Sequence, residues 1–381
     1  MKKKIIRITT IPASLCILLH GQHRFMNQHF EVIGISSEGD FLKEVQKEEG
    51  IRTCAVNMSR SITPIHDLIA LVRLIRIFRK QKPDIIHTHT PKAGILGMLA
   101  AKLAGVPFRL HTVAGLPLLE ATGNKRRLLD FVEKITYACA TKVYPNSFGL
   151  KDIILQNNYC SASKIQVIGN GSSNGIDTEH FSPQQVTSET IEKLKEAYKI
   201  AINDFVFVFV GRLVADKGIN ELVKAFDAVF KECPTAKLLL VGPRESELDP
   251  LNAETDQLLK SNPAILLAGF QQDVRPWLSI ADALVFPSYR EGFPNVVMQA
   301  GAMGLPSIVT DINGCNEIII EGVNGIIIPS KDEEALYKAM KYFIDNKDKV
   351  AEMAANARQL IASRYEQKMV WEAILKEYQS L

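Results

Sequence analysis

Cysteine is scarce and scattered in this sequence. The six cysteines are Cys16, Cys54, Cys139, Cys160, Cys233 and Cys315. None of them forms a Cys-x-x-Cys pair, the closely spaced pattern on which zinc-binding modules usually depend. This distribution argues against a zinc site and fits a reducing compartment, so we expect a cytoplasmic protein.

Long uncharged apolar runs are also lacking. No stretch reaches the roughly 18 apolar residues that a transmembrane helix needs. The first eight residues combine lysines with isoleucines as a signal peptide does, but Arg7 and Pro12 interrupt the apolar run and no small-residue cleavage site follows. We therefore expect a β-strand at the N-terminus, and neither a signal peptide nor a transmembrane helix.

The sequence has no marked excess of charge of one sign. Its 45 Lys and Arg residues against 42 Asp and Glu residues give a net charge of +3. Nucleic-acid binding generally needs a more basic surface, so we expect no nucleic-acid partner. With 46% hydrophobic and 23% charged residues, the composition is that of a globular protein, and 381 residues suffice for two domains.

Short apolar runs alternate with amphipathic segments along the whole chain. Strands are expected at residues 4–9, 31–36, 51–56, 84–89, 107–112, 142–145 and 164–168, then at 205–210, 237–241, 265–268, 284–287, 307–309 and 326–328. Helices are expected between most of them. This alternation predicts an α/β protein with parallel sheets covered on both faces.

A turn-rich stretch at residues 174–183 divides the alternation into two halves. We expect Rossmann-like domains at residues 1–177 and 178–361, and a C-terminal helix at 362–381 that packs back on the first domain. In folds of this kind ligands bind at the carboxyl ends of the strands. Functional residues should therefore follow strands.

Residues 286–299 follow one of these strands and carry the strongest sign of a ligand site. A tight Glu291-Gly292 turn leads into a helix expected to start at Pro294, whose free N–H groups and dipole favour an anion. The Glu291 carboxylate can accept hydrogen bonds from sugar hydroxyls, and Gln299 lies about two helical turns further on. The alternative is an ordinary polar turn between a strand and a helix.

Residues 211–218 follow another predicted strand and supply two cations. Gly211 permits a tight exit from the strand, while Arg212 and Lys217 stand at the start of the next helix, an arrangement that suits a diphosphate. The segment is not a Walker loop, because Gly-x4-Gly-Lys-Ser/Thr is absent. It could also be a solvated helix start without a ligand.

Together these segments resemble retaining glycosyltransferases of family four, which have the GT-B fold. Glu291 matches the first position of the family's Glu-x7-Glu signature, whereas Gln299 replaces the second Glu. Residues 211–218 resemble its Gly-Arg…Lys-Gly element, and 174–181 resemble its interdomain turn. The resemblance covers nearly the whole chain. It implies two Rossmann-like domains facing each other across a cleft, with the acceptor bound by the first and the donor by the second.

The resemblance also implies residue roles. The first Glu of the signature touches the donor sugar, the second position holds the ribose, and the Arg and Lys hold the diphosphate. It implies Arg212, Lys217, Glu291 and His111 as catalytic residues. It implies donor contacts from Gly211, Phe270, Val274, Gly292, Phe293, Pro294, Asn295 and Gln299, with the backbone near Phe270 to Val274 meeting the base.

Histidines follow two strands of the first half. His111 resembles the His that family members place near the donor sugar, although a lone strand-end His is more often structural. His87 and His89 alternate with Thr88, and we expect that they do not both face the cleft. Without a carboxylate cluster beside them, these histidines do not indicate a metal site.

The function implied is metal-independent, retaining transfer of a hexose or N-acetylhexosamine. The donor would be a nucleotide-diphosphate sugar, a UDP-sugar, with no separate cofactor. The acceptor would be a polyprenyl-diphosphate-linked glycan in surface polysaccharide biosynthesis. Two alternatives stay open, a nucleotide-sugar epimerase of the same architecture and a non-catalytic two-lobed binding protein.

Two basic segments indicate a surface for lipid. Residues 71–82 and 125–132 mix Lys and Arg with apolar residues, and basic amphipathic helices can lie on anionic lipid. We expect peripheral contact with the inner face of the cytoplasmic membrane near Arg73–Lys82 and Lys125–Arg127. The alternative is a packed helix with a solvated cationic face.

Overall fold

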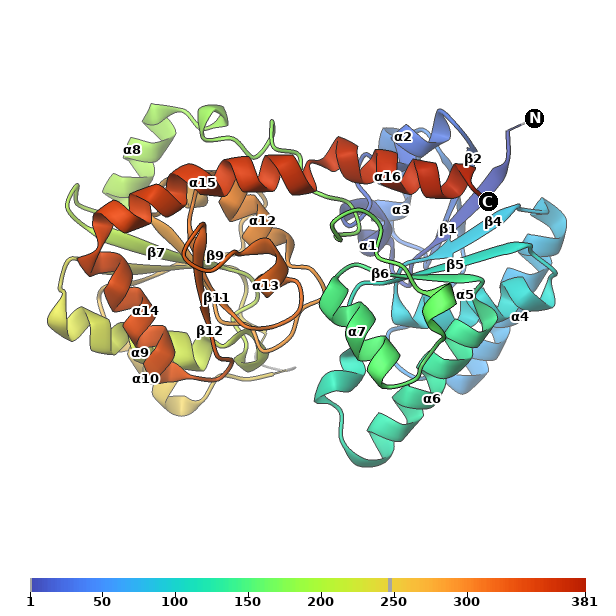
Figure 1. Ribbon diagram of the computed structural model, residues 1–381, viewed down its shortest axis with the longest axis horizontal. Helices are drawn as coiled ribbons and strands as arrows, with labels where there is room; N and C mark the ends of the chain where they lie inside the picture. The colour runs from blue at the N-terminus through green and yellow to red at the C-terminus, as the bar shows by residue number, and fades with distance from the viewer. Residues whose placement is uncertain (1, 246–248) are drawn as a thin grey trace. The chain divides into compact units, whose positions relative to one another are not determined.

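The computed structural model describes residues 2–245 and 249–381, which form two compact units (Figure 1). The first unit comprises Met1–Gly175 and Lys368–Leu381, and the second comprises Ile176–Gln367. The dividing points therefore fall after Gly175 and Gln367, where the sequence suggested 177 and 361. The chain re-enters the first unit at Lys368 and not at 362, because Ile361 and Tyr365 are buried in the core of the second unit.

The first unit is built on a six-stranded sheet in which all neighbours are parallel. Its strands are β1 (Lys4–Ile8), β2 (Glu31–Ser36), β3 (Arg52–Ala55), β4 (Ile85–Thr88), β5 (Phe108–Val113) and β6 (Lys142–Pro145). Their order is β3-β2-β1-β4-β5-β6, so the chain reverses its direction of travel across the sheet between β1 and β4. This is the doubly wound arrangement expected from the sequence.

The strand expected at residues 164–168 does not form. Residues 162–164 are a 3₁₀ turn, η2 (Ala162–Lys164), and the segment after it makes one isolated bridge, between Ile165 and Val143. A single backbone hydrogen bond, from Gln166 N to Val143 O at 3.1 Å, does not continue into a ladder. The apolar alternation of this segment buries Ile165 and Val167 at the sheet edge without building a strand.

Helices cover both faces of the first sheet. One face carries α1 (Pro12–Ile17), α2 (Gln22–Asn27), α3 (Asp40–Glu49) and α16 (Gln367–Gln379), whose apolar side chains form one core cluster. The other face carries α4 (Pro64–Gln81), α5 (Pro91–Leu103), α6 (Gly123–Cys139) and α7 (Phe148–Gln156), which form another, and the 3₁₀ turn η1 (Pro117–Glu120) precedes α6. The last helix thus completes a layer of the first unit.

The second unit repeats the plan with a second parallel sheet. Its strands are β7 (Phe205–Val210), β8 (Ala236–Val241), β9 (Ile265–Gly269), β10 (Ala283–Phe286), β11 (Ser307–Thr310) and β12 (Gly325–Ile328), in the order β12-β11-β10-β7-β8-β9. The uninterrupted apolar run of β7 is explained by its central place, since a middle strand of a parallel sheet is buried on both faces. The reversal point lies between β7 and β10.

The helices of the second unit share one core with its sheet. They are α8 (Ser188–Ala197), α9 (Ile219–Glu232), α10 (Ala253–Ser261), α11 (Arg275–Ser279), α12 (Asn295–Ala302), α13 (Cys315–Ile318), α14 (Glu333–Asp345) and α15 (Lys347–Tyr365), with 3₁₀ turns η3 (Pro183–Gln185) and η4 (Ala215–Lys217). The contact of α12 with α15 is close, because a Cβ at Gly301 would lie 2.6 Å from Ile361. None of the described helices is both long and apolar enough to cross a bilayer.

Candidate active site

Two segments singled out from the sequence meet at the reversal point of the second sheet. β7 and β10 are parallel neighbours, with Ala283 paired to Phe207, so the loops that leave their carboxyl ends lie together. The contact depends on Gly218, which has a left-handed φ of 72° and leaves no room for a Cβ: one would lie 2.1 Å from the carbonyl oxygen of Pro287. The fold thus joins residues 211–218 to the turn that contains Glu291.

Lys217 and Glu291 form an ion pair at this junction. Both side chains are only 17% exposed, so the pair is poorly screened by water. The Ser288 hydroxyl donates a second hydrogen bond to the same carboxylate oxygen at 2.9 Å, and the Asn313 amide donates to the backbone carbonyl of Glu291. The carboxylate is therefore held in one orientation.

Two further ion pairs stand beside the first one. Arg212 donates to the Glu245 carboxylate at 2.9 Å, and Arg290 donates to Asp216 at 3.0 Å. Arg290, Asp216 and Glu245 were not indicated by the sequence. Arg290 could have been found from the sequence, because it directly precedes Glu291 in the same turn. The pairing of Glu245 with Arg212 could not, because it depends on the conformation of a loop. An anion that binds these cations has to displace their carboxylate partners or share the cations with them.

The helix after the turn begins one residue later than expected. Pro294 has extended backbone angles and caps α12, whose first helical residue is Asn295. Phe293 is buried and its ring meets Tyr365 edge-on with centroids 5.2 Å apart, so its side chain packs inward and only its backbone can face a ligand. Gln299 is half-buried on the second turn of the helix.

The segment expected to meet a nucleotide base follows β9 at the edge of the sheet. Phe270 exposes 72% of its surface, unusual for an aromatic side chain, and a flat apolar ring of this kind can stack on a base. Val274 caps α11 and packs partly against the unit core. A backbone hydrogen bond links the end of β9 to the residue that follows β8, since Gly242 N donates to Gly269 O at 2.8 Å.

His111 is buried inside the first unit and belongs to β5 itself instead of following it. Its Nδ1 shares a 2.7 Å hydrogen bond with the Thr88 hydroxyl, and a Cβ at Gly94 of α5 would lie 2.5 Å from the imidazole ring. Burial lowers the pKa of His111 to about 4. Register explains the placement: Thr88 pairs with His111 across β4 and β5, so both face the helix layer that contains α5.

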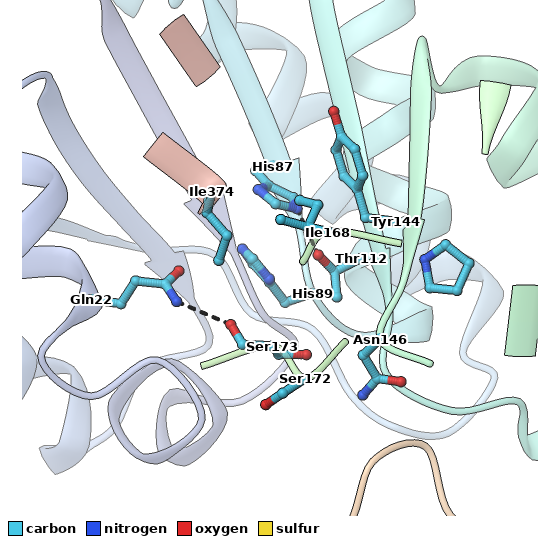
Figure 2. A pocket seen from close by; sticks show the side chains of 11 residues that line it. Gln22, His87, His89, Thr112, Tyr144, Asn146, Ile168, Ser172, Ser173 and Ile374 are labelled. Atoms are coloured by element: carbon cyan, nitrogen blue, oxygen red, sulfur yellow. Dashed lines mark hydrogen bonds between the residues drawn. The ribbon is translucent and has the colours of Figure 1, made fainter. Parts of the chain in front are cut away.

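His87 and His89 lie side by side on the opposite face (Figure 2). Their ring centroids are 4.1 Å apart, and both line a small cavity in the first unit. The alternation with Thr88 was therefore no reason to expect that they cannot both face the cleft, because residues two apart on a strand point to the same face. The intervening Thr88 is the one that points away.

The described residues contain no group of three His, Cys, Asp or Glu side chains placed to hold a metal ion. At the junction in the second unit, Asp216, Glu245 and Glu291 each pair with a different cation. The arrangement is a set of separate ion pairs, and an anionic ligand would compete with their carboxylates for the cations.

Comparison with known proteins agrees with this geometry. Residues 190–360 match the family model of glycosyl transferases group 1, and residues 14–147 match that of glycosyl transferase 4-like domains. The capsular polysaccharide biosynthesis glycosyltransferase CapM of Staphylococcus aureus is 33% identical over 99% of this chain and 97% of its own length. The chain belongs to the group 1 glycosyltransferases.

Other relatives of this glycosyltransferase have more specific names. The UDP-Gal:alpha-D-GlcNAc-diphosphoundecaprenol alpha-1,3-galactosyltransferase of Escherichia coli is 32% identical over 96% of this chain and 95% of its own length. Among solved structures, Anabaena HepE in complex with UDP has a TM-score of 0.81 at 20% identity, with both chains covered completely. WaaG, a glycosyltransferase involved in lipopolysaccharide biosynthesis, has a TM-score of 0.75 at 14% identity, with 97% of this chain and 98% of its own covered. The GT-B fold expected from the sequence is thereby confirmed.

Proposed function

We propose that this glycosyltransferase transfers a hexose or N-acetylhexosamine, with retention of configuration, from a UDP-sugar to a polyprenyl-diphosphate-linked glycan in surface polysaccharide assembly. The observation that carries the donor half is the meeting of Arg212, Lys217 and Glu291 at the reversal point of the second sheet. The names of the relatives from Staphylococcus and Escherichia support the pathway and the lipid-linked acceptor. The UDP complex of HepE supports the nucleotide.

Arg212 and Lys217 would bind the diphosphate of the donor. In the transition state the bond from C1 of the sugar to the phosphate oxygen breaks, and negative charge develops on that oxygen. Two fixed cations stabilise this charge without reorganising, which is the usual way that such sites lower a barrier. The first N–H groups of α12 would add a dipole in the same sense.

Retention follows if the acceptor attacks on the face that the diphosphate leaves. The acceptor oxygen forms a bond to C1 while its proton passes to the departing phosphate oxygen, so no enzyme nucleophile is needed. Glu291 would hold hydroxyls of the donor sugar, Gln299 the ribose, and the exposed ring of Phe270, with backbone near Val274, the base. His111 is assigned to the core of the first unit, because it is buried under α5.

We further propose that the first unit rests on an anionic membrane surface. α4 exposes Ile65, Leu68 and Ile69, and α6 exposes Leu128 and Phe131.

An apolar groove of about 240 Å³ lies between α4 and α6. Its lining includes Ile62, Ile95, Leu96, Leu118, Leu129 and Val132. Exposed Lys125 and Arg127 flank these apolar side chains, and such a mixture suits anionic lipid.

The test is to incubate the protein with labelled UDP-sugars, with and without a lipid-linked glycan acceptor. We expect UDP release and a labelled glycolipid only when acceptor is present, and little effect of EDTA because Arg212 and Lys217 replace a metal at the diphosphate. An altered sugar without acceptor would indicate an epimerase, and tight binding without turnover would indicate a binding protein. Strict dependence on magnesium or manganese would contradict the metal-independent mechanism.

A further inference from the structure

The first unit contains a small cavity, lined by polar and apolar side chains, near the carboxyl ends of β4, β5 and β6 (Figure 2). Its volume is about 20 Å³, room for one group the size of a water molecule. It is lined by Gln22, His87, His89, Thr112, Tyr144, Pro145, Asn146, Ile168, Ser172, Ser173 and Ile374. All these residues belong to the first unit, so the cavity is complete without the second.

Several polar atoms of this lining have no partner in the described part of the chain. His89 is only 5% exposed, and neither of its ring nitrogens makes a hydrogen bond to residues 2–245 or 249–381. The same holds for Asn146 Oδ1 and Ser173 Oγ. Buried polar groups are nearly always hydrogen-bonded, so this group of atoms indicates that something polar enters the cavity.

His87 provides the contrast. Its Nδ1 bonds to the Tyr378 hydroxyl of α16, and its Nε2 bonds to the Thr112 hydroxyl at 2.7 Å. The two neighbouring imidazoles thus differ in their hydrogen bonding. His87 links α16 to the sheet, whereas both nitrogens of His89 remain without a hydrogen-bond partner among the described residues.

The surroundings of His89 keep its ring neutral. Burial lowers the pKa of His89 well below the usual value, and the nearby Arg7 charge acts in the same direction. A neutral imidazole has one nitrogen that donates and one that accepts. Together with the side-chain carbonyl of Asn146 and the hydroxyls of Ser172 and Ser173, the His89 imidazole forms a lining that can both donate and accept hydrogen bonds.

A buried charge behind the cavity biases the site toward an oxygen atom. The Arg7 guanidinium is fully buried, donates to Gln22 Oε1 and to the Tyr378 hydroxyl, and has no carboxylate within ion-pairing distance among the described residues. Gln22 in turn donates from Nε2 to the Ser173 carbonyl at 3.0 Å. Arg7 does not itself line the cavity, so the positive potential is present without a free cation at the surface.

We propose that this cavity is a subsite of the acceptor, in which His89 binds a hydroxyl group of the acceptor sugar. The lining matches a hydroxyl, which donates and accepts, better than a phosphate, which only accepts and is too large for the space. Position agrees, since ligands of doubly wound folds bind at the carboxyl ends of the strands. The proposal rests on the proposed function, because it assumes a glycan acceptor, and it names the residues that would hold that acceptor.

The experiment compares His89→Leu, which fills the space but forms no hydrogen bond, with His89→Gln, which keeps a donor and an acceptor. We expect the Michaelis constant for a short-chain prenyl-diphosphate-linked N-acetylhexosamine to rise about tenfold in His89→Leu and to recover partly in His89→Gln. UDP binding by the second unit should not change in either variant. His23→Leu is the control, a buried histidine of the same unit that does not line the cavity.

A second readout covers variants that turn over too slowly. Saturation-transfer NMR with the same acceptor should detect binding to the wild type and to His23→Leu, and weaker binding to His89→Leu. An unchanged acceptor constant in His89→Leu, with only a lower melting temperature, would mean that the cavity holds a structural water and would overturn the proposal. If the wild type binds this acceptor without transferring sugar, the proposed function fails while the subsite stands.

Discussion

Arg212 and Lys217 each hold a carboxylate, and a diphosphate that binds them must take the place of Glu245 and compete with Glu291. Breaking the first ion pair should cost less free energy than breaking the second. The Arg212–Glu245 pair is over a third exposed on both sides and therefore weak, whereas the Lys217–Glu291 pair is mostly buried. We expect Arg212 to release its partner readily and Lys217 to remain close to Glu291 when the donor binds.

Arg212→Ala and Lys217→Ala should each lower turnover by a factor of about 10² to 10³, the usual loss when one preorganised charge-stabilising donor is removed. The measurement is kcat with saturating acceptor, alongside a melting curve that shows whether the fold survives. Lys224→Ala is a matched control, because Lys224 lies on α9 and pairs with Glu254 outside the junction. Normal turnover in both site variants would rule out the diphosphate assignment.

Glu245→Gln should tighten donor binding. Removing the negative charge frees Arg212, and an exposed pair of this kind contributes up to about 1 kcal/mol, so the donor Michaelis constant should fall by up to about fivefold. Donor titration of the variant and of Glu254→Gln, which breaks the control pair with Lys224, measures the effect. A higher constant in Glu245→Gln alone would mean that Glu245 itself contacts the donor.

Gln299 and Glu291 should respond differently to exchange between amide and acid. If Gln299 holds the ribose, Gln299→Glu should change donor affinity by about 1 kcal/mol or less and leave kcat intact, because ribose contacts are the same in ground and transition states. Glu291→Gln should lower kcat strongly, since its carboxylate also holds Lys217. The measurement is the donor KM and the kcat of the two variants. A large loss of kcat in Gln299→Glu, with kcat kept in Glu291→Gln, would mean that the two residues have the opposite roles.

Sequence patterns singled out Arg212, Lys217 and Glu291 but not the neighbouring Glu245, Asp216 and Arg290. The motifs show which residues follow strands, whereas Arg290 with Asp216 and Arg212 with Glu245 depend on how loops fold back. The surroundings of His111 could not be predicted, for a related reason. Which face of a strand a residue occupies depends on its register with the neighbouring strand, and the Thr88–His111 pairing cannot be read from either strand alone.

At the scale of elements, strand positions were predictable because the strands are buried apolar runs, as in β7 and β10. The failure at residues 164–168 shows the limit of that signal: two buried side chains at a sheet edge give the same alternation as a strand. The basic helices were located correctly in α4 and α6. The apolar exposure of α4, however, lies in its first half, N-terminal to the basic stretch expected to touch lipid.

Ile65→Glu and Phe131→Glu should weaken binding to vesicles that contain anionic lipid. Both side chains are largely exposed, 76% and 60%, so the changes should leave the fold intact while placing a charge where lipid would lie. Co-sedimentation with anionic and neutral vesicles measures the effect. Ile202→Glu is the control, an isoleucine of the second unit that is 95% exposed. Equal sedimentation of all variants would contradict the membrane surface.

At the scale of the whole molecule, the buried histidines divide unequally between the units. His23, His87, His89 and His111 are all buried in the first unit, and their pKa values are lowered mainly by burial, to about 3 for His23 and about 4 for His111. Groups of this kind are neutral in the folded state and take up protons more readily once unfolded. Acid should therefore act first on the first unit.

Acid should destabilise the first unit, because these pKa values are lower in the folded state than in the unfolded state. Because the folded pKa lies below the unfolded value of 6.5, the stabilisation is complete above pH 6.5 and is lost as the pH falls toward 4. Hydrogen exchange measured at pH 7 and pH 5 should show the first unit opening more at pH 5, with the second unit less affected. His111→Gln should flatten this dependence, and an equal response of both units would contradict the assignment.

The return of residues 368–381 to the first unit has a consequence for synthesis on the ribosome. Domains usually fold as they emerge, N-terminal part first. Here the layer that contains α1 and α2 is unfinished until α16 arrives and brings Tyr378 to His87 and Arg7. The second unit can complete its own core first, so the half of the protein that is translated earlier should be the half that matures last.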